Sequence, residues 1–259
     1  MRFIKKLLSL RHYRFLLQQL VTRDFKIRYR GSMLGVLWSA LNPLLNMIVL
    51  SIVFSQVFRA VDNYKMYLLA GLTIFNYFSE ATNIATSSVI SNFGLITKVY
   101  FPKFILPLSK ALSSAINLVI TAVIFLVLGL FMGVKPWIGY LVIPYVLICV
   151  LLFTAGMSFI LSASQVFFRD TQHLYGVLLT IWMYATPILY PIDVIPQQLQ
   201  AIFMANPLYI FIDFLRQLTL YGTFPEPISY LYCALWGLGM FIAGAIVFVK
   251  TQNQFIYYE

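Results

Sequence analysis

The sequence predicts an all-α polytopic membrane protein with six transmembrane helices. Of its 259 residues, 61% are hydrophobic and only 10% are charged, and the mean hydropathy is +0.86. A soluble domain of this length needs more charge to cover its surface. The apolar residues lie in long charge-free runs. A run of about 20 residues is long enough to cross a bilayer as a helix.

Six apolar runs between charged residues define the predicted spans, because unpaired backbone is not tolerated in lipid and each run must be helical. They lie between Arg30 and Arg59, Lys65 and Lys98, Lys110 and Lys135, Lys135 and Arg169, Asp170 and Asp193, and Glu226 and Lys250. The predicted organisation is a basic N-terminal segment 1–30, a transmembrane domain 31–250 and a C-terminal tail 251–259.

The segment between the fifth and sixth runs is apolar but does not read as a seventh span. Pro191, Pro196 and Pro207 interrupt it, and three glutamines lie between residues 197 and 200. Broken helices persist at membrane depth only where protein or water covers them. We expect a re-entrant or interfacial helical hairpin on the outer side.

The distribution of positive charge predicts the orientation. Nine of the eighteen Lys and Arg residues precede residue 31. Within this basic segment we expect residues 2–10 to form an amphipathic helix in the membrane interface. With six spans and the N-terminus inside, fourteen cations fall on cytoplasmic segments and four, including Arg216, on outer ones. This asymmetry places both termini in the cytoplasm. The net charge of +10 therefore indicates contact with anionic lipid and no nucleic acid partner.

The sequence shows no catalytic or cofactor motif. No phosphate-binding loop of the G-x-x-x-x-G-K-[ST] type occurs. Cys149 and Cys233 lie inside apolar runs without metal-ligand spacing, and His12 and His173 are far apart in the sequence. We expect no catalytic residue, no metal site and no cofactor in this chain, so any transport work needs an energy source on a partner.

The second run carries the most informative polar pattern. Asn76, Glu80, Asn83 and Ser87 recur at helical spacing and share one face. A carboxylate at membrane depth costs roughly 2.5 kcal/mol or more, so this face must meet protein or water. It is either the wall of a hydrophilic passage or an interhelical hydrogen-bond cluster. A proton relay is disfavoured because no second buried ionisable residue accompanies Glu80 in the runs.

Aromatic residues make up 17% of the chain. Tyr184, Tyr190 and Tyr209, near the outer end of the fifth span and its hairpin, are the candidates for stacking on sugar rings along a substrate pathway. Ordinary packing and the interfacial aromatic belt explain the same residues and are the favoured interpretation, because composition alone does not separate the two uses.

Four stretches of the chain resemble one transporter family. They are 23–43 (RDFKIRYRGSMLGVLWSALNP), 98–107 (KVYFPKFILP), 167–170 (FFRD), and 186–191 (TPILYP) with 206–208 (NPL). In this order they resemble the permeases of the polysaccharide, O-antigen and teichoic acid export family of ABC transporters, which is Wzm-, TagG- and KpsM-like. The likeness covers nearly the whole chain.

The resemblance implies a homodimer of six-span subunits in the bacterial inner membrane, bound to two copies of a cytoplasmic ABC ATPase that carries ATP and Mg²⁺. It implies export of an undecaprenyl-diphosphate-linked glycan. The N-terminal helix and the loop at 98–110 would contact the ATPase, and the hairpin would form an outer gate. The coupling residues so implied are Lys98, Tyr100, Phe101, Pro102 and Lys103, and the gate residues are Pro191, Pro196 and Pro207. We expect Lys98 and Lys103 to be solvated.

Three alternatives stay open from the sequence. A permease of the same fold could export a drug or an ordinary lipid. An ion-coupled secondary transporter could use Glu80. A membrane scaffold without transport would tolerate substitutions on the polar face.

Overall fold

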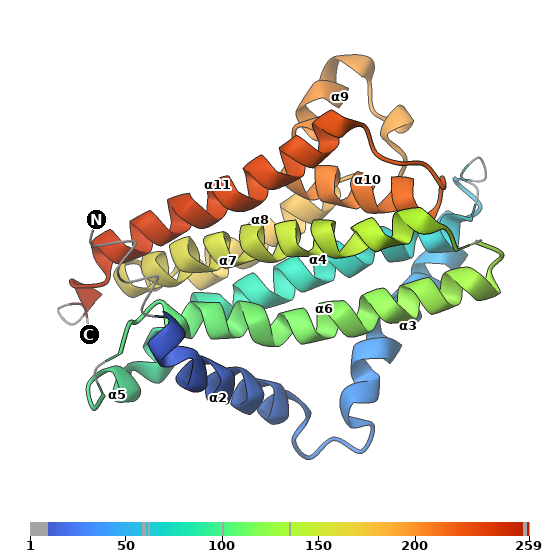
Figure 1. Ribbon diagram of the computed structural model, residues 1–259. Helices are drawn as coiled ribbons and strands as arrows, with labels where there is room; N and C mark the ends of the chain where they lie inside the picture. The colour runs from blue at the N-terminus through green and yellow to red at the C-terminus, as the bar shows by residue number, and fades with distance from the viewer. Residues whose placement is uncertain are drawn as a thin grey trace.

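The computed structural model describes residues 10–58, 61, 63–99, 101–134, 136–255 and 258, with side chains from Tyr13 onward. Every regular element in these ranges is a helix (Figure 1). The α-helices are α2 (Leu10–Tyr29), α3 (Trp38–Phe54), α4 (Tyr64–Thr86), α5 (Phe93–Ile96), α6 (Ile105–Phe131), α7 (Ile143–Phe167), α8 (Thr171–Tyr184), α9 (Gln197–Met204), α10 (Pro207–Thr219) and α11 (Pro227–Thr251). The short 3₁₀ turns are η1 (Gly35–Leu37), η2 (Ile90–Asn92), η3 (Ile138–Val142) and η4 (Ile192–Val194). Of the expected interface helix 2–10 only its last residue lies within the described ranges, and Arg59, Tyr100 and Lys135 lie outside them.

The predicted all-helical class is confirmed, and each of the six predicted apolar runs contains a helix of at least 14 residues. Four segments in the described ranges are long and apolar enough to cross a membrane: Gly35–Phe54, Ile105–Phe131, Ile138–Phe167 and Pro227–Thr251. The other two runs hold α4, which has 23 residues but many polar ones, and α8, which has only 14. The chain is therefore an integral membrane protein, and its count of six spans stays a prediction.

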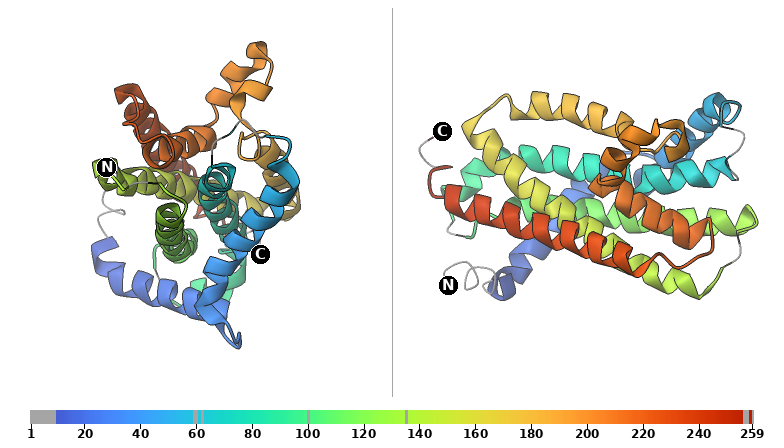
Figure 2. Two further views of the ribbon diagram at one scale, coloured as in Figure 1. Left: turned by 90° about the vertical axis from the view of Figure 1, so that its right-hand side faces the viewer. Right: turned by 90° about the horizontal axis from the view of Figure 1, so that it is seen from above.

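Helix α4 lies in the middle of the bundle, in contact with α3, α6, α7, α8 and α10 (Figures 1 and 2). Helices α7 and α11 pack side by side at very close range. A Cβ atom on Gly244 would lie 2.1 Å from the carbonyl oxygen of Gly156. Small residues of this kind let two backbones approach in a membrane, where tight packing replaces the hydrophobic effect between helices.

A second hydrophobic core closes the end of the bundle where α2 begins and α11 ends (Figure 1). It brings together Leu20 of α2, Phe104 before α6, and Phe248 and Phe255 from the C-terminal end of the chain. Phe248 and Phe255 are fully buried, and the core joins segments that are far apart in the sequence.

The three prolines of the predicted hairpin each start a helical piece. Pro191 precedes η4, Pro196 is the residue before α9, and Pro207 is the first residue of α10. Proline suits the first position of α10 because it has no N–H to leave unpaired and its φ is already helical, whereas Pro191 and Pro196 are the non-helical residues directly before their helices. Helices α9 and α10 meet at 90°, as in a broken span or a re-entrant loop, and re-entry itself stays a prediction.

Candidate functional site

A polar cavity of about 570 Å³ lies between α2, α3, α4 and α6. Most of its lining side chains carry hydroxyl, carboxamide or charged groups although the helices around it are largely apolar. These polar residues are Arg28, Tyr29, Ser32, Ser39, Asn42, Asn46, Thr73, Asn76, Tyr77, Ser79, Glu80, Ser114, Asn117 and Thr121. Polar groups at membrane depth are retained where they face water or a ligand, so this cavity is the candidate functional site.

Glu80 lies at one end of the cavity in an ion pair with Arg28. Ser114 Oγ donates to Glu80 Oε1 at 3.0 Å, and Arg28 Nη2 donates to Ser114 Oγ at 3.1 Å. The side chain of Glu80 is 41% exposed and that of Arg28 is 21% exposed. The pair is thus compensated in charge and still reachable by solvent. The sequence analysis noted no second buried ionisable residue beside Glu80, and its partner Arg28 is a partly exposed residue that reaches it from the N-terminal segment.

Further polar contacts hold α2 against α6 at positions one helical turn apart. Asp24 Oδ2 lies 2.9 Å from Lys110 Nζ, four residues before the Arg28–Ser114 contact on each helix. Tyr29 OH donates to Asn117 Oδ1 at 2.9 Å. In an α-helix, residues four apart lie on one face, so α2 and α6 match along this seam.

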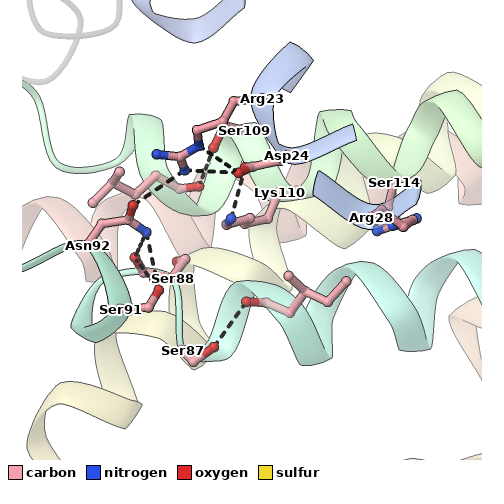
Figure 3. A network of polar contacts seen from close by, with 12 residues as sticks. Arg23, Asp24, Arg28, Ser87, Ser88, Ser91, Asn92, Ser109, Lys110 and Ser114 are labelled. Atoms are coloured by element: carbon pink, nitrogen blue, oxygen red, sulfur yellow. Dashed lines mark hydrogen bonds and ion pairs between the residues drawn. The ribbon is translucent and has the colours of Figure 1, made fainter. Parts of the chain in front are cut away.

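Arg23 extends this network to the turn after α4. It is 2.9 Å from Asp24 Oδ1 and donates to Asn92 Oδ1 at 3.4 Å (Figure 3). A second cavity of about 390 Å³ lies here, lined by Arg23, Asp24 and Lys110 among others. Arg28 lines both cavities, so its pair with Glu80 stands at the boundary between them.

The structure divides the predicted polar face of α4. Asn76 and Glu80 line the larger cavity, whereas Asn83 is exposed and Ser87 is half-buried, and neither lines it. Glu80 is the last residue of α4 to line this cavity, and Asn83 and Ser87 lie beyond the Arg28 contact. Ser87 instead donates to its own helix at Ile84 O over 3.4 Å.

Several cavity residues were missed by the sequence analysis. Asn42 and Asn46 are four residues apart on α3, a helical spacing that could have been noticed in an otherwise apolar run. Their carboxamides and that of Asn76 form no hydrogen bond within the part of the chain that the structure describes, so they are available to water or a ligand. The same ranges contain no group of three or more His, Cys, Asp or Glu residues that could hold a metal ion.

The predicted tyrosines do not join this cavity. Tyr184 is 61% exposed, Tyr190 donates its hydroxyl to the carbonyl of Tyr184, and Tyr209 is half-buried. All three belong to α8 and the hairpin region. The aromatic residues that line the cavity are others, Tyr29, Trp38 and Tyr77.

The predicted coupling residues have different environments. Lys98 is exposed, as expected, and Pro102 is half-buried. Phe101 is buried in the second core. Lys103 Nζ donates to the carbonyl of Gln252 at 2.9 Å and lies over the ring of Phe255. The expectation of a solvated Lys103 was therefore wrong, because the end of α11 folds back onto this loop.

Comparisons with known proteins agree on one family. The family profile for ABC-2 type transporters matches residues 16–220. The O-antigen export system permease protein RfbA of Myxococcus xanthus is 39% identical over 75% of each chain. A Klebsiella pneumoniae protein of the same name is 33% identical over 93% of each chain. The polysialic acid transport protein KpsM of Escherichia coli is 24% identical over 92% of this chain and 93% of its own.

Proposed function

Since this chain belongs to the ABC-2 type transporter family, we propose that it is the permease subunit of a polysaccharide exporter in the bacterial inner membrane. The substrate is an undecaprenyl-diphosphate-linked polymer, such as O-antigen or a related capsule or teichoic acid, moved from the cytoplasmic to the outer face. The observation that carries the proposal is the cavity rich in carboxamides and hydroxyls between otherwise apolar helices.

The chemistry of the cavity suits a hydroxyl-rich ligand. Carboxamides both donate and accept hydrogen bonds, and hydroxyls do the same. Asn42, Asn46 and Asn76 could therefore exchange water for sugar hydroxyls at little net change in hydrogen bonding. An apolar drug or an ordinary lipid tail would leave these groups unpaired, at roughly 1–3 kcal/mol for each buried group.

In the proposed assembly, two copies of this chain bind two cytoplasmic ATPase subunits, which carry ATP and Mg²⁺. Segment 1–30 and the tail 251–259 are cytoplasmic, and 31–250 holds six spans. Lys98 is the exposed cation of the loop that faces the ATPase. We expect Lys98→Glu to leave the protein folded and to weaken co-purification with the ATPase. Unchanged co-purification would remove this loop from the contact.

The decisive experiment compares Asn76→Leu with Asn83→Leu in a strain that lacks the chromosomal copy. Both residues lie on α4, but only Asn76 lines the cavity. We expect Asn76→Leu at normal abundance to lose most surface polysaccharide and to accumulate lipid-linked polymer inside the cell, while Asn83→Leu restores export. If the deletion strain keeps its surface polysaccharide and only changes its drug susceptibility, the glycan assignment is wrong.

A further inference from the structure

Arg216 of α10 is almost completely buried, with 1% of its surface exposed. In the charge distribution Arg216 is one of the four cations on outer segments. Within the described ranges, however, it forms no ion pair with a carboxylate. Its guanidinium instead lies over the ring of Tyr67, 3.4 Å from the ring centroid. An unpaired buried cation is costly, so its surroundings need a specific explanation.

The partners of Arg216 are backbone carbonyls of the chain between α8 and the hairpin. Arg216 Nη1 donates to Pro187 O at 2.8 Å, and Nη2 donates to Ile188 O at 3.2 Å. Nη2 also lies 3.3 Å from Tyr67 O on α4. Three carbonyl dipoles thus face one guanidinium, whose fork of donors suits several acceptors in a way that a lysine ammonium does not.

Two tyrosines of α4 complete the same set of contacts. Tyr64 OH donates to Leu189 O, and Tyr67 OH donates to Tyr190 O at 3.0 Å. Four successive carbonyls, from Pro187 to Tyr190, are therefore satisfied by side chains of α4 and α10. This stretch is not helical, and its residues 187–189 are buried. Non-helical backbone at membrane depth requires such partners.

Helix α4 also leaves room for the guanidinium. A Cβ atom added to Gly71 would lie 3.2 Å from Arg216 Nη2 and 2.9 Å from Ile188 Cγ2. Nine residues further along α4 lies Glu80, about 13 Å away along the helix axis at 1.5 Å per residue. One continuous helix therefore joins the carbonyl cluster at one end to the cavity wall at the other.

We propose that Arg216 is a positioning residue for export, which fixes the stretch 187–190 and the α9–α10 hairpin to α4, the helix that forms the cavity wall. The hairpin can then move only together with α4 or after Arg216 releases the carbonyls. The proposal rests on the proposed function for its link to export, whereas the attachment itself does not depend on the substrate.

The test uses a single cysteine at Leu189, which is 7% exposed, with Cys149 and Cys233 replaced by alanine. The reagent is a charged, membrane-impermeant thiol label added to intact cells. We expect Arg216→Lys to raise labelling roughly tenfold or more over the parent, because losing one hydrogen bond to a charged group eases local opening. Gln217→Ala, on the same helix but outside the carbonyl cluster, should leave labelling unchanged.

Export is measured in the same cells. Arg216→Lys should lose export at normal abundance, with ATPase binding retained, whereas a merely structural role would lower abundance and export together. If Arg216→Lys does not accumulate, Tyr67→Phe, which removes one hydroxyl but keeps the ring, should raise labelling severalfold. Parent-level labelling in the accumulating variant overturns the proposal. Raised labelling in a protein that exports no polysaccharide even as wild type would overturn the proposed function and leave the attachment standing.

Discussion

Two arginines lie inside this helical bundle, and their surroundings differ. Arg216 is 1% exposed and donates to carbonyls in a dry contact between α10, α4 and the stretch after α8. Arg28 is 21% exposed, pairs with Glu80 and borders two cavities. A cation that faces only fixed dipoles has one stable arrangement. A cation that shares a solvent-accessible cavity with a carboxylate can exchange partners. The region around Arg216 is therefore suited to holding a fixed position, and the region around Arg28 to binding a ligand.

The largest expected difference is in stability. Arg216→Met leaves the carbonyl of Ile188 without a donor and that of Pro187 with only the Tyr67 hydroxyl at 3.4 Å, at a cost of about 1–3 kcal/mol for each buried group left unpaired. Arg28→Met leaves Glu80 in a cavity that water can enter, at a cost below about 1 kcal/mol. Thermal unfolding of the detergent-solubilised variants measures both. Equal destabilisation by the two substitutions would break the comparison.

A matched pair of glycines tests the dry region without removing any polar group. Gly71→Ala places a methyl group 2.9 Å from Ile188 Cγ2, and we expect a loss of about 1–3 kcal/mol from overpacking. Gly176→Ala, inside α8 with no atom within 4 Å of the new Cβ, should gain up to about 1 kcal/mol from helix propensity. A lower unfolding temperature for Gly71→Ala and a higher one for Gly176→Ala, each relative to wild type, would support the packing seen around Arg216.

In the wet region the expected effect is on export. Glu80→Gln keeps the acceptor for Ser114 and changes stability by less than about 1 kcal/mol, as for other part-exposed pairs. We expect normal abundance with export reduced severalfold, because Arg28 loses its counter-charge within the cavity. Surface polysaccharide at wild-type level in both Glu80→Gln and Glu80→Ala cells would show that this carboxylate serves neither passage nor pairing.

Substitutions with a small expected effect on stability test whether the two regions lie toward opposite sides of the membrane. Cysteine at the exposed Gln198 on α9 should change stability by less than about 0.5 kcal/mol, and cysteine at the half-buried Thr171 at the start of α8 by about 1 kcal/mol, because the hydroxyl bond to Phe168 O is lost. An impermeant thiol reagent on intact cells should label position 198 and spare position 171. Labelling at 171 would contradict the six-span arrangement on which the orientation of both arginines depends.

Hydrophobic runs predicted the positions of the long helices because run length and helix length are both fixed by the bilayer. Helix α8 was harder, since it ends at Tyr184 although its apolar run continues to Asp193. The run continues as non-helical backbone, buried at residues 186–189, whose carbonyls accept from Arg216, Tyr64 and Tyr67, and such long-range donors leave no local pattern.

The candidate site was predicted only in part for the same reason. The spacing of Asn76 and Glu80 placed them on one polar face, which is a local property of α4. Arg28 is 52 positions before Glu80 in the chain, and nothing in either segment specifies that the Arg28 side chain reaches α4 at that point. Lys103 similarly received a partner, Gln252, from the far end of the chain.

The C-terminal turn has a consequence for biosynthesis. Phe255 fills the core formed by Leu20, Phe104 and Phe248, and Lys103 is held by the carbonyl of Gln252. A membrane protein is synthesised and inserted from its N-terminus, so the surroundings of the loop that precedes α6 are complete only after residues 252–255 have been made. Until then, that loop lacks its final shape. A nascent or truncated chain should therefore bind a soluble partner poorly even when all of its spans are already inserted.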